Sequence, residues 1–207
     1  MTTSSSLPAL LTDGVALLER SMSFTLGGLL LVTPAALTNP TPCADWDLRD
    51  LLLHMNESLQ ALHEAIAVGH LELDPTADIS VARADYGDPY VDPVATLKRR
   101  ACTMVGAWVC ADDARGPGTI TVAERSLTTE VVAAAGAVEV AVHGWDVARA
   151  CGADRSLPAA LAEELLALCA VFVDDGDRPH RFGPVVQADP GATPGDRLVA
   201  LLGRRPH

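Results

Sequence analysis

The sequence predicts an all-α protein, an antiparallel bundle of four main helices with short additional helices and little strand. Apolar residues recur at helical spacing along most of the 207-residue chain, and this 3.6-residue period is the primary signal of an amphipathic helix. Apolar residues make up 49% of the chain and aromatic residues 4%, with Ala, Leu and Val dominant, a composition that favours helices packed through aliphatic side chains. Patterns typical of strands are few, so helices are expected to form the core.

The first two helices are expected at residues 7–32 and from a cap at Asp47 to about residue 68. Leucine, valine and methionine recur at helical spacing in the first, and the prolines of segment 34–42 then break the chain. Asp47 is a suitable N-cap because its carboxylate can accept a hydrogen bond from a free N–H of the first turn. Asp50 follows three residues later, which resembles a capping box with Asp in place of Glu. The start of the second helix is therefore well defined.

Residues 69–92 are expected to be irregular because they contain repeated glycine and proline. A third helix is predicted at residues 93–111, followed by a loop with a short strand at 119–122. The fourth helix is predicted at residues 128–151 and ends at Gly152, a residue type that favours the left-handed conformation found at helix C-termini. With the first two, these helices complete the bundle.

The C-terminal part is predicted to add a helix at residues 159–173 and then a tail rich in Pro and Gly, from about residue 176 to residue 207. The tail closes with a short helix at residues 196–203. No internal repeat and no linker divides the chain. Residues 1–207 are therefore expected to form a single helical-bundle domain whose site is built from inward-facing side chains.

Charge and hydropathy exclude two classes of partner. The chain carries 15 Lys+Arg against 27 Asp+Glu, a formal net charge of −12, and this excess repels the phosphate backbone of nucleic acids. The N-terminus has no basic region followed by a long apolar run, as a secretory signal would have. The most apolar early run, residues 24–32, is interrupted by glycine and is far shorter than the roughly 20 residues that cross a membrane. We therefore expect a cytoplasmic protein with no nucleic-acid or membrane partner.

Two ionisable side chains stand one turn apart in the predicted fourth helix. Glu139 and His143 interrupt the apolar run AVEVAVHGWDVARA at residues 137–150, and side chains at i and i+4 lie on one helix face. His54, on a face of the second helix that also carries small residues, is the best third ligand for a cation. Two imidazoles and a carboxylate with vacant positions are typical of a catalytic divalent-metal site. Zinc fits best, with nickel, iron and manganese as alternatives; the spacing also fits an ordinary Glu–His pair beside an unrelated core histidine.

Asp146 could support such a site from outside. It follows Trp145 directly, and its carboxylate could accept a hydrogen bond from a ligating imidazole. Alternatively, Asp146 could cap the helix or form a salt bridge with Arg149. The sequence leaves both roles open.

Two stretches of the chain resemble a known family. TPCADWDLRDLLLHM, at residues 41–55, is similar to the TPCxxWxxRDLLxH element of the mycothiol-dependent maleylpyruvate isomerase N-terminal-domain family, within the DinB-like superfamily. VEVAVHGWDVARACG, at residues 138–152, resembles the second element of that family, in which ExxxHGWDLA precedes a helix end. The tail FGPVVQADPGATPGDRLVALLGR is similar to the C-terminal stretch of the single-domain actinobacterial members. Residues 69–126 match no family element, and substrate differences are expected there.

The resemblance implies a DinB-like antiparallel four-helix bundle that binds a divalent metal, usually zinc, at one end. The matching positions make His54, Glu139 and His143 its ligands. The resemblance further implies a low-molecular-weight thiol, typically mycothiol, whose thiolate forms at the metal and adds to a small electrophile. It therefore suggests a metal-dependent thiol S-transferase or isomerase.

Other residues of the two elements take supporting roles in this comparison. Trp46 and Trp145 follow the family pattern near the site, and packing is the expected role of both. Cys43 belongs to the first element and is expected to tie its loop onto the second helix. For an anionic substrate, Arg83 and Arg149 are the candidate cations.

Two other functions fit the same residues. Metal-bound water in place of a thiol would make a hydrolase or lyase of a biosynthetic pathway, and a bundle without turnover would be a metal- or ligand-binding protein. The founding isomerase of the family carries an extra C-terminal domain for which 207 residues leave no room, so its isomerisation reaction is not carried over. The expected partners are a small electrophile and a thiol, and the bundle could also pair as a homodimer.

Overall fold

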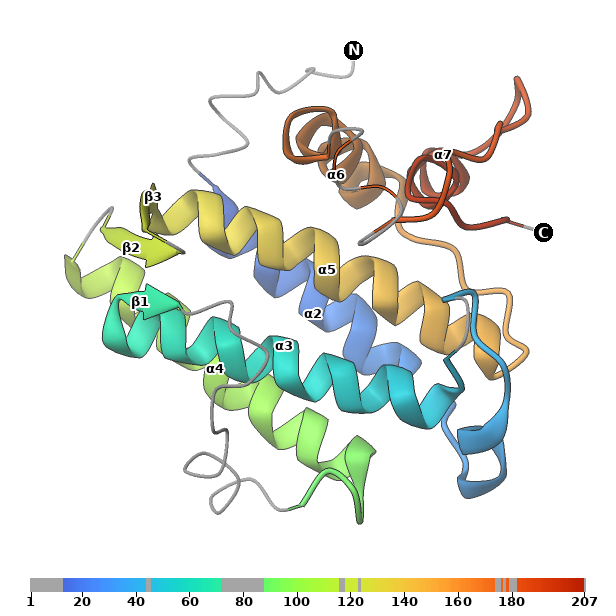
Figure 1. Ribbon diagram of the computed structural model, residues 1–207, viewed down its shortest axis with the longest axis horizontal. Coiled ribbons are helices and arrows are strands. Elements are labelled where there is room, and N and C mark those ends of the chain that lie inside the picture. The colour runs from blue at the N-terminus through green and yellow to red at the C-terminus, as the bar shows by residue number, and fades with distance from the viewer. Residues whose placement is uncertain are drawn as a thin grey trace.

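The structure, a computed structural model, describes residues 13–43, 46–71, 88–115, 118–122, 124–173, 176, 178 and 182–206. It is mostly helical, and its central part is a bundle of four long helices (Figure 1). These helices are α2 (Gly14–Gly28), α3 (Leu48–Val68), α4 (Pro93–Arg115) and α5 (Thr129–Ala150). The all-α bundle predicted from the sequence is therefore confirmed.

The four helices run in two directions. α2 and α5 lie side by side and point the same way, whereas α3 and α4 form a second pair that points the opposite way (Figure 1). The bundle is thus antiparallel between the two pairs and parallel within each pair. Because α3 and α4 are consecutive and parallel, the link between them has to return the chain along the whole bundle. This accounts for the length of segment 69–92.

A small sheet lies at the end of the bundle where α3 ends and α5 begins. β2 (Thr119–Val122) and β3 (Arg125–Thr128) form an antiparallel hairpin between α4 and α5, and β1 (His70–Leu71) pairs in parallel with β2. The predicted strand at residues 119–122 is confirmed with its bounds, but its two neighbours were not predicted. β1 is only two residues long and β3 is mostly exposed, so neither shows the alternating apolar pattern of a strand.

The first helix differs most from its predicted bounds. Residues 7–12 lie outside the described part of the chain, and α2 ends at Gly28 rather than at residue 32. The chain then enters a short 3-10 helix, η1 (Pro34–Thr38). α2 ends in Gly27 and Gly28, and glycine is a weak helix former, so the helix stops before the limit that Pro34 would set. α4, by contrast, continues beyond its predicted end.

The start of α3 is held by the predicted capping box. The Asp47 carboxylate accepts a hydrogen bond from the backbone N–H of Asp50 at 2.9 Å, and the Asp50 carboxylate accepts one from the backbone N–H of Asp47 at 3.3 Å. Such a box satisfies two backbone donors that a helix N-terminus leaves without partners. It therefore anchors the beginning of α3, the segment that carries His54.

α5 packs most extensively on α2, through small residues. Thr25 of α2 donates a hydrogen bond from Oγ1 to the backbone carbonyl of Val140 at 2.7 Å. A Cβ atom built on Gly144 would lie 2.2 Å from the Thr25 Oγ1 and 3.0 Å from the Thr25 Cα. Glycine is therefore required where the two backbones approach, and this contact sets the position of α5 directly beside His143.

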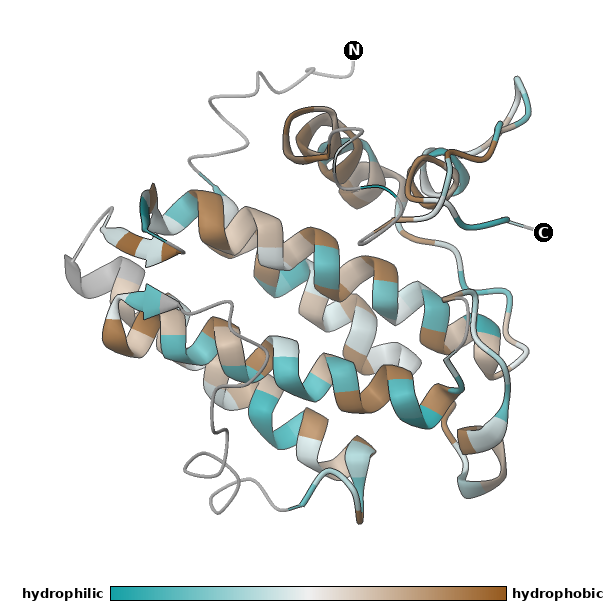
Figure 2. Cartoon of the chain, viewed as in Figure 1, coloured by the Kyte–Doolittle hydropathy of each residue, from teal (hydrophilic) through white to brown (hydrophobic). Residues whose placement is uncertain are grey.

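Of the described helices, α5 is the one that is long and apolar enough to cross a membrane by length and composition. In the structure, 83% of its most apolar window is buried inside the bundle. Figure 2 shows hydrophobic residues distributed along the helices of the bundle, α5 included. The apolar character of α5 is thus that of a core helix surrounded by other helices.

Two further helices form an outer layer beside the bundle (Figure 1). α6 (Ala159–Phe172) and α7 (Pro194–Leu201) pack on one another, and α6 also contacts α5. The Arg20 guanidinium of α2 donates to both carboxylate oxygens of Glu164 on α6, at 2.9 and 2.6 Å. We refer to the described residues from 159 to 206 as the C-terminal layer.

Candidate metal centre

Three side chains from two helices converge in the bundle. His54 on α3 lies opposite Glu139 and His143, which are one turn apart on α5. The Nε2 atom of His54 lies 2.8 Å from Glu139 Oε1, and the Nε2 atom of His143 lies 3.3 Å from the same oxygen. The possible ligand atoms of the three residues all lie within 4.8 Å of one another. The structure thus brings together the three residues predicted as ligands.

Neighbouring residues hold this arrangement. Ser58, one turn beyond His54 on α3, donates a hydrogen bond from Oγ to Glu139 Oε1 at 3.0 Å. The rings of His54 and His143 meet edge to face with centroids 5.0 Å apart, and the partly exposed Trp46 covers His54 with ring centroids 4.8 Å apart. The His54 and Glu139 side chains are 34% and 36% exposed, whereas His143 is 9% exposed. The site is therefore open to solvent on the side of α3 and closed behind His143.

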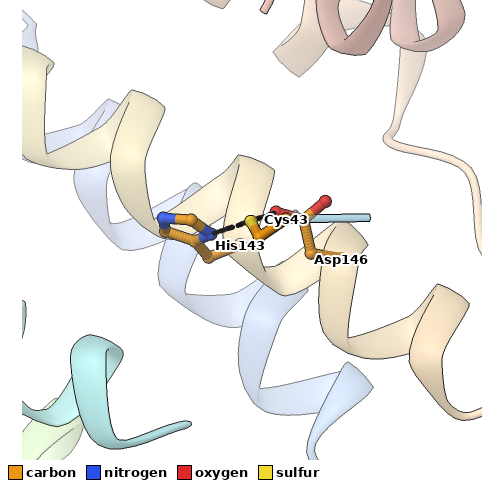
Figure 3. Close-up of side chains that lie close together, drawn as sticks. All are labelled: Cys43, His143 and Asp146. Atoms are coloured by element: carbon orange, nitrogen blue, oxygen red, sulfur yellow. Dashed lines mark hydrogen bonds and ion pairs between the residues drawn. The ribbon is translucent and has the colours of Figure 1, made fainter. Parts of the chain in front are cut away.

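A second cluster lies behind His143 (Figure 3). The Nδ1 atom of His143 lies 3.0 Å from Asp146 Oδ2. The Cys43 thiol donates to the same oxygen at 3.2 Å, and Nη2 of Arg204 donates to it at 3.0 Å. Both ring nitrogens of His143 face carboxylates, Nδ1 toward Asp146 and Nε2 toward Glu139. An imidazolium can donate to both, whereas a ring that binds a metal through Nε2 keeps its proton on Nδ1, where Asp146 accepts it.

The charged groups of the site shift one another's pKa values. Partial removal from water alone would raise the pKa of the 36% exposed Glu139, but attraction to His143 and hydrogen bonds to both imidazoles hold that pKa well below its usual range. Burial alone would lower the pKa of His143, but Glu139 and the hydrogen bond to Asp146 hold it well above its usual range. For Asp146, hydrogen bonding to His143 and the charge of Arg204 outweigh burial and lower the pKa. The surroundings of His143 therefore favour a positive charge, which a proton or a metal ion can supply.

Among the residues that the structure describes, two overlapping groups of side chains have metal-ligand spacing. One consists of the three convergent residues, and the other consists of Cys43, His143 and Asp146. The Arg204 guanidinium already contacts this second group, at 3.0 Å from Asp146 Oδ2 and 3.2 Å from Cys43 Sγ. A fixed positive charge at such distances repels a second cation. The two groups thus have similar spacing, but only the group of Cys43, His143 and Asp146 already has a fixed positive charge beside it.

The remaining predicted residues divide between the site and its surroundings. Asp146 takes the acceptor role toward His143 rather than pairing with Arg149. Arg149 instead lies 5.6 Å from the centroid of the Trp145 ring and contacts Asp154 at 3.5 Å. Trp145 is buried among core residues, in line with a packing role. Arg83 lies outside the described residues.

Two contacts at the site differ from, or add to, the sequence predictions. The expectation that Cys43 ties its loop onto α3 is wrong, because its thiol bonds to Asp146 of α5 and approaches Arg204. Arg204 was not predicted at all. Its partners lie 58 and 161 residues away in the chain, so no local spacing joins them. The available signal was its place at the end of the tail that resembles the family.

A small apolar pocket adjoins the site. The space inside it is about 10 Å³, enough for about one water molecule, and its polar lining residues are Thr25, Ser58, Glu139 and His143. Its apolar wall consists of Met22, Leu29, Met55, Leu59, Leu97 and Val140. Such a wall lowers the local dielectric constant and so strengthens the electrostatic interactions at the site.

Comparison with known proteins gives the chain a family. A family profile described as the mycothiol maleylpyruvate isomerase N-terminal domain matches residues 18–148. The chain belongs to this family. No curated protein and no solved structure gives a significant match. Membership relates the chain to mycothiol-linked, DinB-like proteins, and the matched segment contains the three convergent residues and Asp146 but ends before the C-terminal layer.

Proposed function

We propose that this member of the mycothiol maleylpyruvate isomerase N-terminal domain family is a divalent-metal-dependent thiol S-transferase or isomerase. His54, Glu139 and His143 would hold the metal, mycothiol would be the thiol cosubstrate, and a small electrophilic metabolite would be the substrate. The observation that carries this proposal is the approach of two imidazole Nε2 atoms to one carboxylate oxygen, at 2.8 and 3.3 Å, beside an apolar pocket.

The set of donor atoms suits a divalent ion of intermediate softness. Two neutral imidazoles and one carboxylate leave a coordination position open, as in catalytic rather than structural zinc sites. Zinc also accepts thiolate ligands, which harder ions such as magnesium bind poorly. Zinc is therefore the first candidate, and nickel, iron and manganese share the same ligand types.

Charge favours this group of ligands over the overlapping group that contains Cys43. A cation bound between Cys43 and Asp146 would lie against the Arg204 guanidinium, which donates to both residues. The Glu139 carboxylate, in contrast, contacts two imidazoles and the Ser58 hydroxyl but no fixed cation among the described residues. A metal ion there would supply the charge that compensates Glu139.

The chain's own residues would orient and shield the reacting groups. Ser58 holds the Glu139 carboxylate through its hydrogen bond, and Asp146 fixes the tautomer of His143. When bound, the metal lowers the pKa of a thiol, so that the thiolate is available near neutral pH. The apolar residues beside Glu139 and His143 would shield the reacting groups from water on the inner side of the site, which would favour attack by the thiolate over hydrolysis of the electrophile.

Metal content tests the site first. Protein incubated with zinc and then desalted is expected to hold about one equivalent by elemental mass spectrometry. His143→Ala removes a ligand and should lose the metal, whereas His70→Ala, at an exposed position on β1, should retain it. A wild-type protein that stays empty after incubation with zinc, nickel, iron and manganese refutes the metal site.

Thiol dependence then tests the class of reaction. Metal-loaded protein is incubated with mycothiol and a panel of electrophiles, including a chromogenic chlorodinitrobenzene, and conjugates are followed by absorbance and mass spectrometry. Turnover that requires the thiol and is lost in His143→Ala supports the transferase or isomerase. Turnover of esters or amides without thiol would instead indicate a hydrolase that uses metal-bound water. Loaded protein that converts none of these compounds would contradict the proposed reaction.

A further inference from the structure

Arg204 reaches from the C-terminal layer back to the metal site. Its side chain is 9% exposed and lies behind His143, against α5. Its Nη2 atom donates to Asp146 Oδ2 at 3.0 Å, and its Nε atom lies 3.5 Å from the other carboxylate oxygen. Nη2 also lies 3.2 Å from Cys43 Sγ, and Nη1 donates to the Leu202 carbonyl at 2.9 Å. One guanidinium thus joins the loop before α3, the helix α5 and the C-terminal layer.

The backbone after α7 is shaped to deliver this side chain. The N–H of Arg204 donates to the carbonyl of Val199 at 2.8 Å, and the N–H of Gly203 donates to that of Ala200 at 3.1 Å, the pattern of a Schellman motif. Gly203 has a φ of 85°, and a Cβ atom there would lie 2.6 Å from the Gly183 Cα. Only glycine fits both conditions. The backbone of Arg204 is therefore held in one place relative to α7 and to the segment at Gly183.

The Asp146 carboxylate depends on this cation. Asp146 is 0% exposed, and a buried carboxylate left without a charged partner strongly destabilises a fold. The planar guanidinium reaches both carboxylate oxygens and so fixes the orientation of the group as well as compensating its charge. The oxygen that receives the shorter of these contacts, Oδ2, is also the one that faces His143 Nδ1.

We propose that Arg204 is a positioning residue of the metal centre. Through Asp146 it would set the ring orientation and the tautomer of His143, so that Nε2 faces the ion. This role rests on the metal site proposed above. The proposed ligands all lie inside the family match at residues 18–148, whereas the C-terminal layer lies outside it. Through Arg204, the C-terminal layer would nevertheless contribute to the metal site.

The zinc affinity of matched variants tests this role, measured by competition with a chromophoric chelator. Arg204→Met is expected to weaken zinc binding about 10–100-fold, the usual effect of removing an outer partner of a metal ligand. Arg205→Met, at the exposed next residue, should leave the affinity unchanged. Asp146→Asn should weaken binding by a comparable factor. Because Arg204 acts through Asp146, adding Arg204→Met to Asp146→Asn should weaken binding no further.

Further measurements separate positioning from simple folding. Circular dichroism checks that each variant is folded, and the cobalt absorption spectrum reports the geometry of the ligands. If Arg204→Met does not fold, Arg204→Lys takes its place. Lysine keeps the positive charge but loses the planar guanidinium that donates to both carboxylate oxygens of Asp146. Weaker zinc binding and a shifted cobalt spectrum are therefore expected. The Asp146→Asn, Arg204→Met double variant removes both buried charges and should stay folded.

The outcomes are distinct. Folded Arg204 variants that bind zinc as the wild type does would overturn the role of Arg204 while leaving the metal site intact. An equal loss from Arg204→Met in the wild-type and Asp146→Asn backgrounds would also overturn it, because Arg204 would then not act through Asp146. A wild-type protein that binds no metal would overturn the proposed function, and the role of Arg204 with it.

Discussion

Gly144→Ala tests the close packing of α5 on α2. The new Cβ would lie 2.2 Å from the Thr25 Oγ1, 2.9 Å from its Cβ and 3.0 Å from its Cα, where ordinary contacts lie at 3.4–4 Å. Rotation of the Thr25 side chain cannot relieve a contact with its own Cα. The two helices would therefore have to separate at this crossing.

The expected effect combines three contributions. Overpacking of this kind costs about 1–3 kcal/mol. Separation of the helices also disrupts the buried hydrogen bond from Thr25 to the Val140 carbonyl, and an unsatisfied buried group costs about 1–3 kcal/mol. Alanine recovers about 1 kcal/mol of helix propensity relative to glycine. We expect Gly144→Ala to lower the free energy of unfolding by about 3 kcal/mol.

Urea denaturation of the metal-free protein, followed by circular dichroism, measures this change. Gly106→Ala is the matched control, because Gly106 is exposed in the interior of α4 and nothing lies within 4 Å of its Cβ position. The control should gain up to about 1 kcal/mol from helix propensity alone. If Gly144→Ala proves as stable as the wild type, or gains stability as the control does, glycine is not required at the helix crossing.

The remaining predictions concern pH and thiol reactivity. The raised folded-state pKa of His143 stabilises metal-free protein fully below its ordinary value of 6.5, and this contribution is lost as the pH rises through the folded-state value. The lowered pKa of Glu139 acts in the opposite sense, stabilising the fold above 4.5 and losing effect as the pH falls through its folded-state value. Zinc should abolish this loss of stability at high pH, because a metal-bound imidazole is already deprotonated. Melting temperatures measured across pH with and without zinc check this. A melting temperature that falls as steeply at high pH with zinc as without it would contradict the prediction. Burial raises the pKa of Cys169 to about 12, so a maleimide should label the exposed Cys102 and Cys110 before Cys169 in folded protein. Peptide mass spectrometry after brief labelling measures the order, and earlier labelling of Cys169 would contradict the prediction.

Local signals predicted most of the helix ends correctly. Asp47 and Asp50 form the expected capping box, and Gly152 ends α5 with a φ of 73°. These features depend on contacts within a few residues, which a sequence displays directly. Local signals alone could not predict that His54 meets Glu139 and His143, because these residues lie on two helices that are far apart in the sequence. The resemblance of both stretches to one family supplied that link.

Partners that are distant in the chain could not be predicted in this way. Asp146 has Arg149 as an obvious neighbour three residues on, yet it pairs with Arg204, 58 residues away. The two side chains point in different directions from α5. Asp146 points into the interior, whereas Arg149 lies over the ring of Trp145 and reaches Asp154. Which side of α5 is covered depends on how the C-terminal layer packs. No spacing within α5 records that packing.

The pairing of Asp146 with Arg204 also implies an order of events during synthesis. Arg204 follows Asp146 by 58 residues, which at about 5–20 residues per second is a delay of about 3–12 seconds. By then the ribosome has made α2, α3, α4 and α5 in full, and these helices can already pack, with His143 and Cys43 as the polar partners of Asp146. A newly made chain would therefore pass through a bundle that has all its predicted ligands but lacks its last supporting contact.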